Sequence, residues 1–326
     1  MDALKLAIGL MLLLGGGEAV VRGAAAVARK FGISPLAIGL TVVAFGTSAP
    51  ELAVNITAAI ADKPDISFGN IIGSNMANIG LVVGCCGLVR ALPIKSVVVA
   101  REIPMMLLAT MATMVMAADG LIEGKVAIFD RGDGVLLLLL FSVFLYYTIG
   151  ELLRQRADHP VLEDLVTSDL PGVRPGVAVT RDGLLAVAGF GALLYGADLT
   201  VEGATALARL FGVPEVVVGL GAVAIGTSLP ELATGLMATI RGHMELAIGN
   251  VVGSNVFNLL LVLAVTVCIR PLEVPERGMI DLGFALLLSL ALLVVSLTNH
   301  RRILRAEAGL LLAAYILYLS WRTVVI

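Results

Sequence analysis

GLTVVAFGTSAPELA, at residues 39–53, is repeated as GLGAVAIGTSLPELA at residues 219–233, without a gap in the alignment. A second motif keeps the same offset, with GNIIGSNMAN at 69–78 and GNVVGSNVFN at 249–258. Across the longer alignment that joins both motifs, the two copies share 21 identities in 44 positions. General hydrophobicity does not fix residue types in this way, so the chain contains an internal repeat.

The composition places this repeat in a membrane protein. Of the 326 residues, 59% are hydrophobic and 14% are charged, whereas soluble chains average about 45–50% apolar and about 25% charged residues. The apolar residues fall in blocks of about 18 to 25, the length that an α-helix needs to cross the hydrocarbon core. The lipid bilayer is therefore the expected partner, and we expect neither a nucleic-acid partner nor an obligate protein partner.

Ten apolar blocks predict an all-α, polytopic membrane protein of ten transmembrane helices. We place a first five-helix repeat at residues 1–150, a cytoplasmic linker at 151–182 and a second five-helix repeat at 183–326. Because five is odd, the second repeat must enter the membrane from the opposite side, which predicts inverted-topology repeats. The ten expected helices cover residues 3–22, 34–60, 66–89, 99–118, 132–150, 183–200, 213–240, 246–269, 279–298 and 304–324.

Basic residues are distributed unevenly between the two sides of this predicted topology. The loops after the odd-numbered helices carry fourteen of the 22 Lys and Arg residues, and the other side carries eight. By the positive-inside rule, both termini should lie outside and the linker should lie in the cytoplasm.

Each copy of the first motif places one glutamate deep within an apolar block, Glu51 in the first and Glu231 in the second. A carboxylate in hydrocarbon is costly unless a neighbouring group or a bound ion compensates it. A single glutamate of this kind could serve only in helix packing, but two at equivalent positions favour a functional role. We therefore expect the pair to form the centre of a site.

Hydroxyl groups accompany each glutamate at helical spacing. Thr47 lies four residues before Glu51 and shares its helix face, and Ser48 lies beside them. The second copy repeats the pattern with Thr227, Ser228 and Glu231. Oxygen atoms of several side chains should therefore converge in each copy.

A proline interrupts each of these helices. Pro50 and Pro230 lack the N–H that would bind the carbonyl four residues earlier, so each helix should kink or break there. We expect carbonyls near the kinks to face a cavity, those of Ala44 and Gly46 and those of Ala224 and Gly226. Carbonyl, carboxylate and hydroxyl oxygens are the ligands that hard cations such as Ca²⁺ prefer.

The second motif supplies an opposing wall. Polar side chains recur there every fourth residue and so lie on one helix stripe in each copy. With the turn near Lys63, this stripe reaches a depth similar to that of Glu51, so the two can line one pocket. The stripes contain Asn70, Ser74 and Asn78, with Asn75 adjacent, and Asn250, Ser254 and Asn258, with Asn255 adjacent.

The two pairs of motifs resemble those of a known family. GTSAPE with GSNMAN, and GTSLPE with GSNVFN, are similar to the paired α-repeats of the calcium/cation antiporter superfamily. The likeness covers both repeats and is closest to the prokaryotic sodium/calcium exchanger branch. It implies an integral protein of the prokaryotic inner membrane that transports Ca²⁺ and Na⁺, or H⁺, without a cofactor.

The resemblance also implies a set of ligands. Glu51 and Glu231 correspond to the family's central calcium ligands, which also serve sodium. The same likeness assigns ligand roles to the side chains of Thr47, Ser48, Ser74, Thr227, Ser228 and Ser254 and to the carbonyls of Ala44 and Ala224. We add Asn78 and Asn258 to the candidate site from their place on the polar stripes. Asn258 departs from the family, which often has aspartate there, so stoichiometry and driving ion do not follow from the resemblance.

Four functions are compatible with parts of this pattern. The first is Ca²⁺/Na⁺ exchange by alternating access around the glutamate pair, and the second is exchange of Ca²⁺ or another divalent cation for H⁺. A passive cation channel would share the ligands but needs no inverted repeat. An intramembrane serine hydrolase would need a base near Ser48 or Ser228, yet all three histidines fall in predicted loops. We therefore expect a transporter and not an enzyme.

Overall fold

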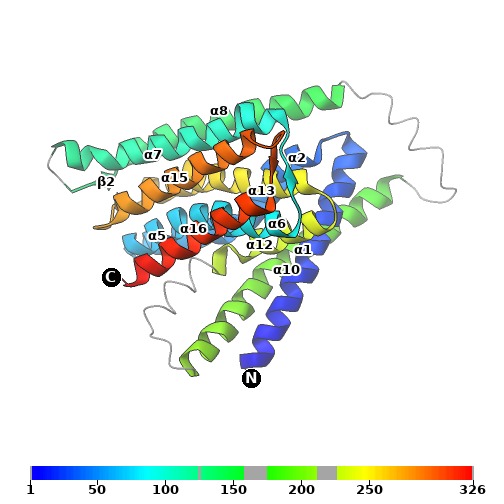
Figure 1. The fold of residues 1–326 in the computed structure, drawn as a ribbon, viewed down its shortest axis with the longest axis horizontal. Coiled ribbons are helices and arrows are strands. Elements are labelled where there is room, and N and C mark those ends of the chain that lie inside the picture. The colour runs from blue at the N-terminus through cyan, green and yellow to red at the C-terminus, as the bar shows by residue number, and fades with distance from the viewer. Residues whose placement is uncertain (1, 124–125, 158–174, 211–225, 325–326) are drawn as a thin grey trace.

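The computed structural model describes residues 2–123, 126–157, 175–210 and 226–324 of the chain. These residues are mostly helical (Figure 1). Seven described helices are long and apolar enough to cross a bilayer, and one bent helix pair would form an eighth span. The expectation of an integral, mainly helical membrane protein agrees with this, whereas the number of ten spans stays a prediction.

The first half runs from the N-terminus to the long helix before the linker. Its elements are α1 (Asp2–Phe31), α2 (Pro35–Ile38), the π-helix η1 (Gly39–Val43), α3 (Ala44–Thr47), α4 (Ala49–Ile60), α5 (Pro64–Ala77), the π-helix η2 (Asn78–Val83), α6 (Gly84–Val89), β1 (Leu92–Pro93), the π-helix η3 (Val98–Glu102), α7 (Ile103–Glu123), β2 (Ile128–Phe129) and α8 (Arg131–Ala157).

The second half contains a similar series. Its described elements are α10 (Pro175–Leu210), α12 (Leu229–Ile240), α13 (Met244–Phe257), the π-helix η4 (Asn258–Val262), α14 (Leu263–Ile269), β3 (Leu272–Glu273), α15 (Gly278–Leu297), β4 (Arg302–Ile303) and α16 (Arg305–Val324). The helix expected at 213–240 is described only from residue 226 onward.

The linker differs from the expectation at both of its ends. α8 continues to Ala157 and α10 begins at Pro175, so both helices extend into the segment 151–182. Residues 151–157, ELLRQRA, are good helix formers, which explains the extension of α8 beyond its apolar block. Residues 158–174 lie outside the described part of the chain.

Two very short antiparallel strand pairs accompany the helices. β1 pairs with β4, and β2 pairs with β3. Each pair therefore joins one half of the chain to the other. The connecting segments use these pairings to satisfy backbone N–H and C=O groups between helices. Strands of two residues carry no readable periodicity, so the sequence could not have predicted them.

Helices α1 and α10 pack along each other through glycines (Figure 1). A Cβ on Gly16 would lie 2.8 Å from the carbonyl oxygen of Gly189, and one on Gly9 would lie 2.8 Å from that of Gly196. Side chains larger than hydrogen would therefore separate the two helices, as is common at helix contacts in membranes. Glycines with close contacts of this kind recur at seven-residue intervals, at Gly9, Gly16 and Gly23 and at Gly189, Gly196 and Gly203.

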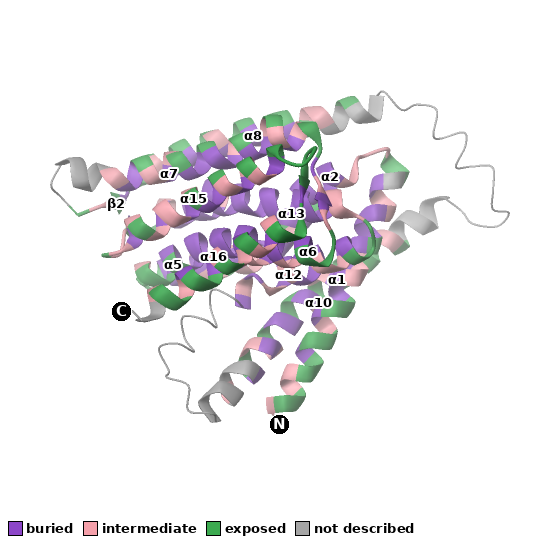
Figure 2. Cartoon of the chain, viewed as in Figure 1, coloured by how far each residue is buried: buried purple, intermediate pink, exposed green. Residues whose placement is uncertain are grey.

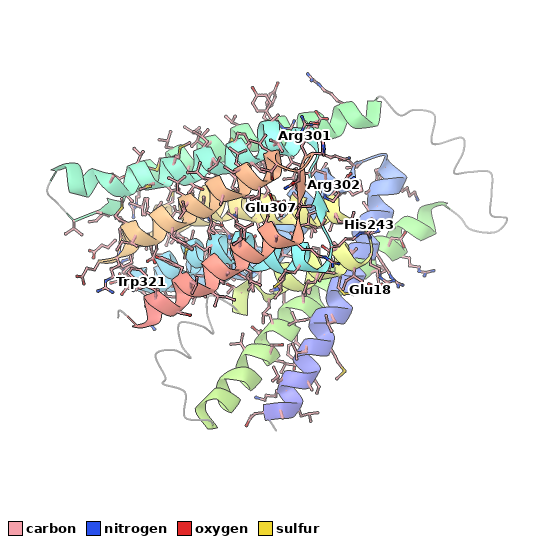
Figure 3. All side chains as sticks on the ribbon, in the orientation of Figure 1. Glu18, His243, Arg301, Arg302, Glu307 and Trp321 are labelled. Carbon is pink, nitrogen blue, oxygen red and sulfur yellow. The ribbon has the colours of Figure 1, made fainter. Side chains whose placement is uncertain are left out.

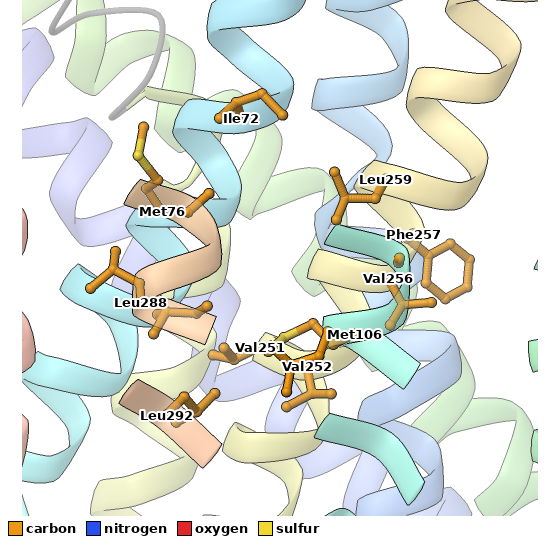
Figure 4. Close-up of a cluster of buried hydrophobic side chains, with 14 of the residues drawn as sticks. Ile72, Met76, Met106, Val251, Val252, Val256, Phe257, Leu259, Leu288 and Leu292 are labelled. Atoms are coloured by element: carbon orange, nitrogen blue, oxygen red, sulfur yellow. The ribbon is translucent and has the colours of Figure 1, made fainter. Parts of the chain in front are cut away.

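The helices of the second motif form the centre of the protein. In the most apolar stretches of Pro64–Val89 and Met244–Ile269, 78% of the residues are buried, compared with 22% in α8. Figure 2 shows the same contrast between the central and peripheral helices. Apolar side chains such as Met106, Val252 and Phe257 fill the space around α13 (Figure 4). The peripheral helices expose apolar side chains instead, as expected for surfaces that face lipid.

Candidate functional site

Glu51 lies in the first turn of a helix that starts at a break in the chain. α3 ends at Thr47, Ser48 has φ −84° and ψ 3°, and α4 begins at the next residue. The helical stretches on either side of Ser48 are bent by 41°. Because Pro50 cannot donate a hydrogen bond to the carbonyl of Gly46, the helix cannot continue unbroken. The kink predicted from the sequence is confirmed.

Glu231 has the same setting in the second half. Ser228 has φ −87° and ψ 0°, and α12 begins directly after it with Pro230 in its first turn. Both glutamate side chains are fully buried, each with 0% exposure. Each lies at a helix N-terminus, where the helix dipole favours negative charge.

The expected free carbonyl at Ala44 is wrong. Its oxygen accepts the backbone N–H of Ser48 at 2.9 Å and lies 3.4 Å from the Thr47 hydroxyl. Proline removes only the bond from its own position, so the carbonyl that it frees is that of Gly46. A ligand role for Ala44 would use the second lone pair of the same oxygen and stays a prediction. Ala224 lies outside the described residues.

The polar stripes of α5 and α13 face the two glutamates. The Ser74 hydroxyl donates to Glu51 Oε1 at 3.4 Å, and the Ser254 hydroxyl donates to Glu231 Oε1 at the same distance. The stripe residues are all buried, with exposures from 0% to 4%: Asn70, Ser74, Asn75, Asn78, Asn250, Ser254, Asn255 and Asn258. The predicted opposition of the two walls is therefore present in each half.

Hydrogen bonds between the halves join the two walls into one site. The Thr47 hydroxyl lies 3.1 Å from Asn250 Oδ1, to which it donates, and 3.4 Å from the Ser254 hydroxyl. Ser48 donates to Glu231 Oε1 at 3.5 Å. In the opposite direction, Thr227 donates to Asn70 Oδ1 at 2.9 Å and lies 3.3 Å from the Ser74 hydroxyl. Each half therefore completes the polar surroundings of the other.

The asparagines that end the stripes differ between the halves. Asn78 begins η2 and donates its amide N–H to Asn255 Oδ1 at 2.9 Å. Asn258 begins η4 and is 0% exposed, but neither polar atom of its side chain has a hydrogen-bond partner. Both sit where the helix widens to a π turn, a feature that is frequent at functional sites.

Negative charge at the site is not balanced by a buried basic side chain. Among the described residues, the buried set contains no Lys or Arg. The second carboxylate oxygens, Glu51 Oε2 and Glu231 Oε2, are buried without a hydrogen-bond partner. Two buried carboxylates in this setting require a compensating positive charge. The site is therefore suited to a cation or to protons.

The available donor atoms indicate which class of cation fits. The site offers carboxylate, hydroxyl and amide oxygens, the ligands that Ca²⁺ and other hard cations prefer. In the described part of the chain, no three or more His, Cys, Asp or Glu side chains cluster as a metal site. Metals that prefer thiolate or imidazole ligands, such as Zn²⁺, therefore have no matching set of donor atoms there.

The two described histidines lie in turns between elements. His243 occupies the turn between α12 and α13, where Figure 3 labels it, and His300 lies in the turn before β4. Both positions agree with the loops predicted for them, and His159 lies outside the described residues.

Three polar residues outside the predicted ligand set belong to the polar surroundings of the glutamates. Asn70 and Asn250 were placed on the stripes but not among the ligands, yet they accept the two threonine hydroxyls from the opposite half. Their position one helical turn before Ser74 and Ser254 was the available signal. Thr234, one turn beyond Glu231, is fully buried with an unpartnered hydroxyl. Its counterpart by the repeat offset is Val54, so the repeat concealed it.

Comparison with known proteins gives the family. A family model described as sodium/calcium exchanger protein matches residues 2–150 and 183–324. This chain belongs to the sodium/calcium exchanger family. The resemblance of its motifs to the calcium/cation antiporters is thereby confirmed, and the family is one of transporters and not of catalytic enzymes.

Similar proteins of this family span the full length of the chain. The putative antiporter CaxA of Alkalimonas amylolytica is 38% identical over 95% of both chains. The sodium/calcium exchanger MaX1 of Methanosarcina acetivorans is 30% identical over 97% of both. A solved structure of the sodium-calcium exchanger NCX_Mj superimposes with a TM-score of 0.82 at 31% identity and 98% coverage of both chains.

Proposed function

We propose that this exchanger-family chain carries Ca²⁺ across the membrane in exchange for Na⁺, at a site around Glu51 and Glu231. The proposal rests on the pair of fully buried carboxylates, each with one oxygen that has no hydrogen-bond partner. Among the described residues, no buried Lys or Arg is available to neutralise them. Two carboxylates supply a charge of about −2, which balances one Ca²⁺. Similar proteins that are described as sodium/calcium exchangers support the same pair of ions.

The remaining ligands in the proposal come from both halves. Thr47, Ser48, Thr227 and Ser228 supply hydroxyls beside the glutamates, and Ser74 and Ser254 supply hydroxyls from the facing helices. Asn78 and Asn258 supply amide oxygens, and both of these oxygens lack a hydrogen-bond partner. The carbonyls of Ala44 and Ala224 complete the proposed set.

We infer that two inverted five-helix repeats, 1–150 and 183–326, build this site. Helix bounds support the repeat, because α12 and α13 start and end 180 residues after α4 and α5. The strand pairs β1–β4 and β2–β3 are reciprocal, since β3 likewise follows β1 by 180 residues. In such an architecture, equivalent motifs flank one site near the membrane midplane, with ten spans in total. The linker 151–182 would then be cytoplasmic and both termini would lie outside, in a prokaryotic inner membrane.

The mechanism follows from the cost of moving charge. An empty site with two carboxylates would expose about −2 charge to hydrocarbon during reorientation, which is strongly unfavourable. Occupation by one Ca²⁺, or by the counter-ions, removes this penalty and permits the site to face the other side. Coupled exchange, and not leak, is the consequence.

The test is uptake of ⁴⁵Ca²⁺ into proteoliposomes of the full chain. Vesicles loaded with Na⁺ are compared with vesicles loaded with K⁺, and with K⁺-loaded vesicles under an imposed pH gradient. We expect uptake only with internal Na⁺, and loss of uptake in Glu231→Gln. The matched control is Glu202→Gln, the same change on an exposed carboxylate that pairs with Lys5.

Other outcomes would replace the proposal. Uptake that follows only the pH gradient assigns the chain to Ca²⁺/H⁺ exchange, with the neutral Asn258 as the residue to test next. Calcium flux without any counter-ion would indicate a passive channel.

A further inference from the structure

A cavity of about 330 Å³ lies between two walls. One wall consists of η3 and the start of α7, and the other is the C-terminal part of α8. Its lining includes Arg101, Glu102, Leu108, Val143 and Tyr147, and none of its lining residues belongs to the candidate ion site. The volume falls within the range of about 300–1,000 Å³ that is usual for sites of small molecules.

The position of this cavity in the membrane is given by the spans that enclose it. The candidate spans are Val98–Ala118 and Arg131–Glu151, so the charged lining residues Arg101 and Glu102 lie near the start of one span. Glu151 lies just beyond the lining, at the end of the other span, and pairs with Arg101. Leu108 and Val143 lie about seven or eight residues further in, which corresponds to about 10 Å along a helix. The cavity therefore has a polar end at the membrane surface and an apolar wall toward the midplane.

Exposure of the wall supports contact with lipid. Leu108 is 45% exposed, Val143 is 47% exposed and Tyr147 is 60% exposed. Tyrosines are enriched at the level of lipid headgroups, where their rings are partly apolar and their hydroxyls are polar. Tyr147 thus marks the boundary between the polar end and the apolar wall.

The polar end carries charges of both signs. Arg101 donates from Nε and Nη2 to Glu102 Oε1, at 2.7 and 2.5 Å, and Glu102 is only 1% exposed. Glu102 therefore fixes the orientation of the guanidinium. Arg101 Nη1 lies 3.7 Å from Glu151 Oε2, and the side chains of Arg101 and Glu151 are 32% and 34% exposed. A guanidinium and a carboxylate are thus presented side by side at the membrane surface.

We propose that this cavity binds a phospholipid with a primary ammonium headgroup, of the phosphatidylethanolamine type. Arg101 binds the phosphate, for which a guanidinium is well suited. Glu151 accepts a hydrogen bond from the ammonium, Glu102 positions Arg101, and the wall of Leu108 and Val143 receives an acyl chain. A trimethylated ammonium has no N–H to donate, and an anionic lipid without an amine leaves Glu151 facing the phosphate.

A comparable pair between neighbouring helices of the second half provides a control. Arg322 on α16 donates from Nε to Asp281 Oδ1 on α15 at 3.2 Å, and Tyr318 donates to the same oxygen at 2.6 Å. There the ring of Tyr318 stacks on Phe284, with centroids 3.8 Å apart. Aromatic rings occupy the space beside this pair, so Arg322→Gln removes a similar ion pair without changing the proposed lipid site.

The experiment counts lipids retained by the purified full-length protein. The protein is equilibrated with an equimolar mixture of phosphatidylethanolamine, phosphatidylcholine and phosphatidylglycerol in detergent, and bound lipid is identified by native mass spectrometry. We expect about tenfold enrichment of phosphatidylethanolamine, the effect of one charge-assisted hydrogen bond. Glu151→Gln should reduce this to the level of phosphatidylcholine, and Arg322→Gln should leave it unchanged.

Filling the cavity gives a second, independent variant. Leu108→Trp occupies the apolar wall at an exposed position and should remove all three retained lipids. Equal retention of the three lipids by the unmodified protein, or enrichment that persists in Glu151→Gln or Leu108→Trp, overturns the proposal. Neither outcome depends on which ion is exchanged.

Discussion

The two copies of the glutamate motif share their backbone from the serine onward but differ in the hydrogen bond that this serine makes. Ser48 and Ser228 have φ and ψ within 3° of each other, and each precedes a helix of twelve residues. Yet Ser48 donates to Glu231, whereas the Ser228 hydroxyl is buried without a partner. The described backbone from the serine onward is the same in both copies, whereas the surroundings of the serine hydroxyl differ. The site is built from unequal halves.

The halves also differ four residues beyond each glutamate. Asn55 donates its amide to the Glu51 carbonyl at 2.7 Å, and its counterpart by the repeat offset is Gly235. A Cβ on Gly235 would lie 3.0 Å from Val82 Cγ1 and 3.2 Å from Cys86 Sγ. The second half therefore uses the glycine to pack closely against the first half, where an asparagine would not fit.

The largest expected effect comes from neutralising either glutamate. Glu51→Gln and Glu231→Gln should each weaken Ca²⁺ binding by about 30-fold or more, because each removes one of two charges from a buried site. Isothermal titration calorimetry measures the affinity. Without ions, both variants should unfold at a higher temperature than the unmodified protein, since each loses an uncompensated buried charge.

The exposed Glu202→Gln serves as the control for this comparison and should change neither quantity. If only one glutamate variant loses Ca²⁺ binding, the two halves do not share one ion in the way that we propose.

An exchange of the residues at 55 and 235 should have the next largest effect. Gly235→Asn should lower the free energy of unfolding by about 1–3 kcal/mol through overpacking against Val82 and Cys86. Asn55→Gly should cost about 2 kcal/mol, from one lost hydrogen bond and the helix penalty of glycine. The stabilities of both variants are compared by thermal unfolding, with the remaining monodisperse protein as the readout. Gly235→Ala is the intermediate control, and an Asn at 235 that is tolerated as well as Ala would contradict the packing argument.

The two asparagines at the starts of η2 and η4 should respond differently to substitution, and the smallest effect on stability is expected for Asn258. Asn78→Leu should lower the free energy of unfolding by about 1–3 kcal/mol, because Asn255 Oδ1 loses its donor. Asn258→Leu removes two polar atoms that have no partner, so stability should change by less than about 1 kcal/mol.

Calcium binding distinguishes a ligand from a packing residue at position 258. If Asn258 is a ligand, Asn258→Leu should reduce Ca²⁺ affinity by about tenfold although the protein remains stable, because one oxygen donor is lost. Unchanged affinity in a stable variant would remove Asn258 from the proposed site. Titration of the same preparation used for thermal unfolding measures both properties together.

Much of the architecture could be predicted from the sequence because its signals are local. Apolar blocks of membrane length, prolines within them and the fixed repeat offset led to the helices, to the break at Ser48 and to the burial of Glu51 and Glu231. The stripe Asn70–Ser74–Asn78 likewise follows from helical spacing. These features need only the period of a helix and the chemistry of single residues.

The features that sequence reasoning missed depend on contacts between distant segments. The bond from Thr47 to Asn250 joins residues that are far apart in the chain, and so does the pairing of β1 with β4. The expected freeing of the Ala44 carbonyl is wrong because proline removes only the hydrogen bond from its own position, so the carbonyl that it frees is that of Gly46. The repeat gives no signal for Thr234, because its counterpart Val54 carries no polar group.

The strand pair β1–β4 has a consequence for how the protein is made. β1 lies at residues 92–93, and its partner at 302–303 is synthesised only after both motifs of the second half. The polar surroundings of Glu51 also remain incomplete until Thr227, which lies in the second half, has been synthesised. The early helices must therefore remain in the membrane with incomplete partners during translation, when an unfinished polar surface is open to wrong associations.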